Sequence, residues 1–150
     1  MTMNNLRRAF LQKVTALTAL ALLPLRLIAG EWNKVAFDAK TLPEALKGAG
    51  LLNAVESKDI FIKAPDVAEN SAVVPIEVTC KIPDTRIISI FADKNPQPLI
   101  AQFNIAGGVE PYVSIRIKMG DTGNIRVVAQ AGDKQYVATR KVEVTVGGCG

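Results

Sequence analysis

The sequence contains no histidine, only two cysteines and only 5% aromatic residues. Without histidine, the chain lacks the most common general base and the most common metal ligand, which excludes the usual catalytic triads and most zinc sites. The cysteines, the three methionines and the scattered carboxylates form no cluster at metal-ligand spacing. We therefore expect no metal, no cofactor and no catalytic residue in this chain.

Acidic residues are absent from positions 1–29, which hold four of the 18 basic residues: Arg7, Arg8, Lys13 and Arg26. The formal net charge of +4 therefore comes from this segment, since 14 basic and 14 acidic residues remain beyond it. A neutral remainder lacks the positive surface with which proteins bind phosphate backbones. We expect no nucleic-acid partner.

The first 29 residues have the pattern of a signal peptide rather than of a folded segment. The stretch from Arg7 to Lys13, Arg-Arg-Ala-Phe-Leu-Gln-Lys, resembles the twin-arginine signal that exports folded proteins across the bacterial inner membrane. The apolar run Val14 to Leu25 is shorter than the ~20 residues of a membrane span. We predict export to the periplasm, cleavage near Ala29-Gly30, and no permanent membrane anchor.

Beyond the signal, the pattern is that of short strands separated by turn residues. Thr41 and Glu44 form a capping box with Pro43 in the first turn, so a short helix begins there and ends at Gly48. This predicts an all-β, immunoglobulin-like sandwich over residues 30–146 with one short N-terminal helix. The predicted strands are Ser57–Ala64, Ala72–Ile82, Arg86–Ala92, Leu99–Ile105, Tyr112–Lys118, Asn124–Gln130 and Gln135–Val146.

Two predicted strands carry basic side chains at alternating positions. Arg116 and Lys118 alternate with apolar residues, and Arg126 lies in the next strand. This alternation is typical of a solvent-facing surface of a sheet. Steering of an anionic ligand by the three residues is the alternative interpretation.

The last strand stops at Gly147-Gly148-Cys149-Gly150. Glycines on both sides of a cysteine free the backbone, so the thiol could enter a narrow cleft. An extended tail of this length reaches roughly 10 Å beyond the sandwich. No cation, metal or helix N-terminus stands beside Cys149 to activate the thiol. We therefore predict that residues 147–150 are a flexible arm that presents Cys149 to enzymes that supply the chemistry.

Two alternatives to a carrier arm remain open. An oxidising compartment favours a disulfide between Cys80 and Cys149, which would make the chain a stapled, non-covalent binding module. Cys80, however, shares its strand face with Val74, Ile76 and Val78, where a small buried thiol fills the core. A thiol-disulfide oxidoreductase would normally carry a Cys-x-x-Cys pair, which the sequence lacks.

The C-terminal residues Val144 to Gly150, Val-Thr-Val-Gly-Gly-Cys-Gly, resemble the C-terminal signature of the SoxY family, whose members usually end one glycine later. The resemblance extends to Asp93-Lys94-Asn95-Pro96, followed by Pro98-Leu99, to the stretch Ile115–Gly120, and to the export signal. It covers most of the chain beyond residue 29. The family carries thiosulfate in the periplasmic sulfur-oxidation system.

The resemblance implies a mechanism and partners. A c-type cytochrome would join thiosulfate to Cys149 oxidatively, and a hydrolase would then release sulfate. The remaining sulfane sulfur would stay on Cys149 for sulfane-oxidising enzymes. A second small β-sandwich protein, SoxZ, would form a heterodimer with the chain. The residues alone add only that a long edge strand such as Gln135–Val146 invites either pairing or protection.

Overall fold

The strands that the sequence predicts form two sheets in the computed structural model, which describes residues 33–145. Residues 1–32 and 146–150 lie outside the described part, so the predicted signal peptide and arm are not part of this description. The larger sheet has the strand order β1-β9-β8-β5-β6, and β3 also pairs with β9. Its members are β1 (Val55–Glu56), β3 (Val67–Ala68), β5 (Thr85–Ala92), β6 (Leu99–Asn104), β8 (Gly123–Ala131) and β9 (Lys134–Val144).

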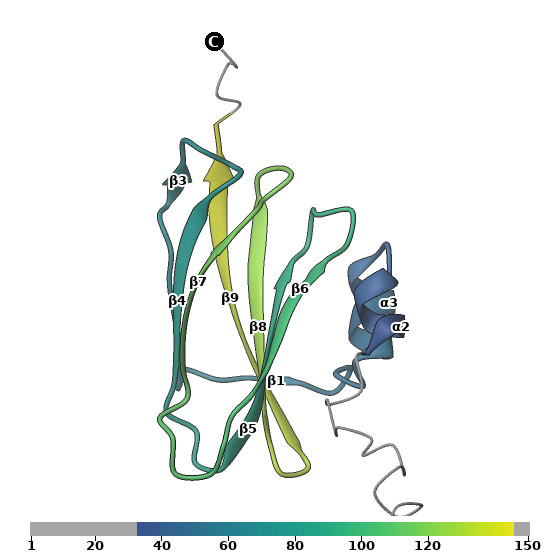
Figure 1. Ribbon diagram of the computed structural model, residues 1–150, viewed down its shortest axis with the longest axis vertical. Helices are drawn as coiled ribbons and strands as arrows, with labels where there is room; N and C mark the ends of the chain where they lie inside the picture. Colours follow the sequence, from purple (N-terminus) through teal and green to yellow (C-terminus); the bar gives the residue numbers. More distant parts are fainter. Residues whose placement is uncertain (1–32, 146–150) are drawn as a thin grey trace, which may run out of the picture. The chain divides into compact units, whose positions relative to one another are not determined.

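The smaller sheet has the order β2-β4-β7 and lies against the larger one (Figure 1). Both of its pairings are antiparallel. Every second residue of β4 is buried, as the alternation in the sequence predicts. The members of this sheet are β2 (Ile60–Lys63), β4 (Val74–Cys80) and β7 (Tyr112–Ile117).

The main core fills the space between the two sheets. It is built from β-branched side chains, which suit the pleated surface of a strand. The connectivity places β2, β4 and β7 where immunoglobulin-like sandwiches have strands A, B and E, and β9, β8, β5 and β6 where they have G, F, C and C′. The predicted all-β, immunoglobulin-like sandwich is therefore confirmed. Fully or almost fully buried core residues include Val74, Ile76, Val78, Ile88, Ile90, Ile125, Val127 and Val142.

In the part of the chain that the structure describes, two short helices precede the strands, where the sequence predicted one (Figure 1). The predicted helix is α3 (Leu42–Gly48), with the capping box between Thr41 and Glu44 in place. The additional helix is α2 (Lys34–Asp38). A Cβ on Gly48 would lie 2.9 Å from the backbone of Ala36, so the glycine allows the two helices to approach closely.

A second, smaller core lies on the outer face of the larger sheet. Ala36 and Ala45 of the two helices are buried there together with Phe91 and Val128 of the sheet. The helices therefore cover one face of the sandwich and remove its apolar side chains from water. Among the described residues, no helix is long and apolar enough to cross a membrane.

The strand β9 differs from the long open edge that the sequence predicts. Two-residue strands pair parallel to it, β1 at Tyr136–Val137 and β3 at Glu143–Val144. The remaining length of this edge, between the two short strands, has no backbone partner among the described residues. Both ends of the β9 edge are therefore paired with backbone of the same chain. The sequence did not predict β1 and β3, because two residues are too few to show a periodic pattern.

Candidate functional site

The predicted site residues Gly147, Gly148, Cys149 and Gly150 lie outside the described residues. What the structure describes is the root of the predicted arm, because β9 ends at Val144 and the description ends at Thr145. This root lies at one end of the sandwich, where β3 and the turn between β7 and β8 also lie (Figure 1). The contacts that hold the end of β9 are therefore those at the start of the predicted arm.

On one side of the root, β3 binds the final residues of β9. The amide of Glu143 donates to the carbonyl of Asp66 at 2.9 Å. The amide of Thr145 donates to the carbonyl of Ala68 at 3.2 Å, and the Thr145 hydroxyl donates to the same oxygen at 3.3 Å. These contacts hold the backbone as far as the last described residue.

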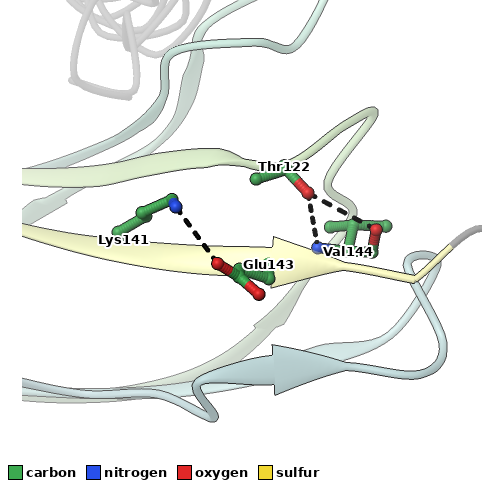
Figure 2. A network of polar contacts seen from close by, with 4 residues as sticks. All are labelled: Thr122, Lys141, Glu143 and Val144. Atoms are coloured by element: carbon green, nitrogen blue, oxygen red, sulfur yellow. Dashed lines mark hydrogen bonds and ion pairs between the residues drawn. The ribbon is translucent and has the colours of Figure 1, made fainter.

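On the other side of the root, the Thr122 side chain contacts the end of β9. The Thr122 hydroxyl accepts a hydrogen bond from the Val144 amide at 2.9 Å and donates to the Val144 carbonyl at 3.4 Å (Figure 2). On the same strand, the Lys141 ammonium and the Glu143 carboxylate form an ion pair at 3.1 Å (Figure 2). Both side chains of that pair are well exposed, so it adds little to stability.

Cys80 lies at the opposite end of the sandwich and is a free, buried thiol. It ends β4, whose first residue Val74 lies toward the arm root, because Val74 pairs with Ile117 and Ser71 contacts Met119. The Cys80 sulfur is 3.3 Å from the Thr85 hydroxyl and is otherwise part of the main core. The prediction that Cys80 fills the core is confirmed.

Comparison with known proteins gives the family. The family model described as "Sulfur oxidation protein SoxY" matches residues 47–149, a range that includes Cys149. The chain belongs to the SoxY family. A solved structure, the sulfur carrier protein SoxY from Chlorobium limicola f thiosulfatophilum, is 42% identical over 71% of this chain and 97% of its own, with a TM-score of 0.64. The resemblance to SoxY in the sequence is thereby confirmed.

Two further comparisons add nothing to the SoxY assignment. No curated protein sequence matches the chain. A chain from the structural study of T cell specificity and activation by the bacterial superantigen toxic shock syndrome toxin-1 is 14% identical, over 57% of this chain and 99% of its own. Its TM-score of 0.40 is too low to bear on fold or function.

The three basic residues considered for ligand steering are not brought together in this SoxY fold. Arg116 lies on the solvent-facing side of the smaller sheet, and Lys118 is exposed just beyond the same strand. Arg126 belongs to the larger sheet, on the face that packs against the helices, and pairs in register with Phe91. The prediction that Arg116 and Lys118 face solvent is confirmed. The alternative, that these two residues and Arg126 together steer an anionic ligand, is wrong because Arg126 lies on a different sheet.

A hollow of about 470 Å³ lies at the Cys80 end of the SoxY sandwich. Cys80, Thr85, Arg86 and the loop 106–111 line it. Because this end is far from the root of the predicted arm, the hollow lies apart from the predicted attachment site. Among the residues that the structure describes, no group of acidic residues, cysteines or histidines could hold a metal ion.

Thr122 and Ala68 are the residues that the sequence did not single out. Thr122 stands in a turn between glycines, and a threonine there is typical of any loop. Ala68 acts through its carbonyl, so its side chain carries no signal. Only their hydrogen bonds to Val144 and Thr145 show that both residues hold the root of the predicted arm.

Proposed function

We propose that this chain is the sulfur carrier of a periplasmic sulfur-oxidation system and that Cys149 is the covalent attachment point. The observation that carries the proposal is membership of the SoxY family over a range that includes Cys149. The 42% identity to a protein described as a sulfur carrier supports the same role. The carrier itself is not a catalyst, since the steps below need an oxidant and a hydrolase from partner proteins.

The first step joins thiosulfate to the thiol. A bond forms between the Cys149 sulfur and the outer sulfur of thiosulfate, the thiol loses its proton, and two electrons leave: R–SH + S₂O₃²⁻ → R–S–S–SO₃⁻ + H⁺ + 2 e⁻. A c-type cytochrome accepts the electrons. Because Cys149 lies between glycines, no side chain shields the new bond from the partner enzyme.

The second step releases sulfate. Water attacks the terminal sulfone sulfur and the bond between the two outer sulfur atoms breaks: R–S–S–SO₃⁻ + H₂O → R–S–S⁻ + SO₄²⁻ + 2 H⁺. A partner hydrolase catalyses this step, and the persulfide that remains on Cys149 passes to sulfane-oxidising enzymes. A carrier that holds its cargo covalently keeps the reactive intermediate from diffusing away between enzymes.

The partners and the compartment follow from the same proposal. The twin-arginine pattern at residues 7–13 supports export to the periplasm, where electron-accepting cytochromes are available. A SoxZ-like protein is the expected second subunit of a heterodimer. Edge strands that a partner could pair with include β6 in the larger sheet and β2 and β7 in the smaller one, in addition to the short strands β1 and β3 beside β9.

The decisive experiment compares the two cysteines. Chain purified from the periplasm of thiosulfate-grown cells should carry a reducible adduct with the mass of thiosulfate or of sulfur atoms on the C-terminal peptide. Cys149→Ser should keep the fold but lose the adduct and thiosulfate oxidation completely. Cys80→Ala is the matched control and should retain both, with a stability loss of about 1 kcal/mol for a small core truncation. Thiosulfate oxidation by the Cys149→Ser protein would rule out the carrier function.

A further inference from the structure

Two segments of the SoxY resemblance, 93–96 and 115–120, contact each other near the arm root, although neither carries the reacting thiol. The Asn95 side chain joins them. Its Nδ2 donates to the carbonyl of Lys118 at 2.7 Å, and its Oδ1 accepts from the amide of Gly120 at 2.7 Å. One amide side chain thus satisfies both a donor and an acceptor of the neighbouring turn.

Asp93 fixes the far end of the same turn. Its Oδ1 accepts from the Asn124 amide at 2.8 Å, and its Oδ2 accepts from the Asn124 side-chain Nδ2 at 2.9 Å. Between these points the chain passes close to Asp93, and a Cβ on Gly123 would lie 2.5 Å from Asp93 Oδ1. The turn 118–124 is therefore held at both ends by the loop 93–95, and we call this arrangement the brace.

Thr122 lies within the braced turn and extends the sheet by one side chain. Backbone pairing between β8 and β9 ends at Gly123 and Val142. Val144 lies two residues beyond Val142, and the Thr122 hydroxyl binds both its amide and its carbonyl, as Figure 2 shows. The hydroxyl takes the place of a neighbouring strand at the position where β9 would otherwise begin to fray.

We propose that Thr122 is a positioning residue for the carrier arm: held by the brace, its hydroxyl fixes the point and the direction in which the chain leaves the sandwich. The inference rests on the proposed function, because it assumes that Cys149 delivers cargo. From a fixed Thr145, four extended residues reach Cys149 at no more than about 14 Å. If Val144 were released from Thr122, the segment between the sheet and Cys149 would be longer. The effective concentration of the Cys149 thiol at a docked partner's active site would then be lower.

The first test needs no partner. Hydrogen exchange of the amides of Val144 and Thr145 is measured in the exported chain, in Thr122→Val and in Thr122→Ser. The valine removes the hydroxyl at nearly constant volume, so we expect exchange at Val144 to become at least about 10-fold faster while the β9 centre is unchanged. The serine retains the hydroxyl and should stay within about twofold of the unchanged chain. Equal exchange in Thr122→Val would overturn the inference.

The second test measures delivery. Each variant is added at rising concentration to thiosulfate and the periplasmic fraction of cells that lack this chain, and the thiosulfate-dependent reduction of cytochrome c is followed. Since docking surfaces are untouched, KM for the carrier should stay within about twofold, whereas kcat should fall about 5- to 10-fold in Thr122→Val and recover in Thr122→Ser. A purely structural defect would not separate kcat from KM in this way, and an unchanged kcat would refute the positioning role.

Asn95→Ala provides an independent route to the same answer if Thr122→Val does not fold. It removes the side chain that contacts Lys118 and Gly120 but leaves Thr122 unchanged, and it should also lower kcat. An unaltered kcat in this variant, with exchange at Gly120 accelerated, would overturn the inference. Failure of the proposed function is a different result: the unchanged chain itself would then support no thiosulfate-dependent reduction.

Discussion

At the scale of single residues, Gly123 shows how closely the loops at the arm root are packed. A methyl group at this position would lie 2.5 Å from Asp93 Oδ1 and 2.7 Å from Lys94 Cγ. Asp93 cannot move away freely, because its carboxylate accepts two hydrogen bonds from Asn124. We expect Gly123→Ala to lower the free energy of unfolding by about 1–3 kcal/mol, measured by urea denaturation.

Gly107→Ala is the matched control for this prediction. The added methyl group would meet only the end of the Arg86 side chain, at 3.0 Å, and that side chain is exposed and can move. Its cost should therefore stay below about 0.5 kcal/mol. Equal losses for the two glycines would show that the close packing around Asp93 does not constrain the turn.

At the scale of elements, the capping box of α3 is the local signal that the sequence displayed most clearly. The Thr41 hydroxyl accepts from the Glu44 amide at 3.4 Å, and the Glu44 carboxylate accepts from the Thr41 amide at 3.2 Å. Thr41→Ala should cost about 0.5–1 kcal/mol in urea denaturation, because the first turn loses an acceptor. Glu44→Gln keeps an acceptor for the Thr41 amide and should cost less; the reverse order would contradict the role of the cap.

The elements that were predicted from the sequence have a local signal, which is an apolar or alternating run of residues or a helix cap. All seven predicted strands and α3 are present in the structure. Six of these strands have six to eleven residues, and the seventh, β2, has four and was predicted from the apolar run Ile60–Ile62. The missed elements, α2, β1 and β3, have five residues or fewer, so they depend on contacts made by distant segments. The Gly-Gly-Cys-Gly motif of the predicted arm was visible because it is continuous in the sequence, whereas Thr122 and the brace depend on contacts between distant segments.

At the scale of the whole molecule, Cys80 and the root of the predicted arm lie at opposite ends of the sandwich. From Val74, near the arm root, β4 runs about 20 Å to Cys80 at ~3.3 Å per residue. The five residues from Val144 to Cys149 span at most about 17 Å when extended. A disulfide adds about 5.5 Å between the two Cα atoms, so it could form only if residues 145–149 ran fully extended back along the sandwich. The Cys149 thiol would also have to enter a core in which Cys80 is only 2% exposed.

The distance between Cys80 and the arm root, together with the burial of Cys80, predicts that no disulfide joins the two cysteines. A reductant should therefore leave the melting temperature of the monomer unchanged to within about 1 °C. A disulfide between Cys80 and Cys149 would instead contribute about 2–4 kcal/mol, and its reduction would lower the melting temperature by roughly 10 °C. The monomer is isolated by size exclusion before heating, because a disulfide between two Cys149 thiols would also respond to reductant. Cys149→Ser serves as the reference that cannot form either bond. If the unchanged monomer melts above this reference only without reductant, the chain is stapled and its thiol is not free to carry sulfur.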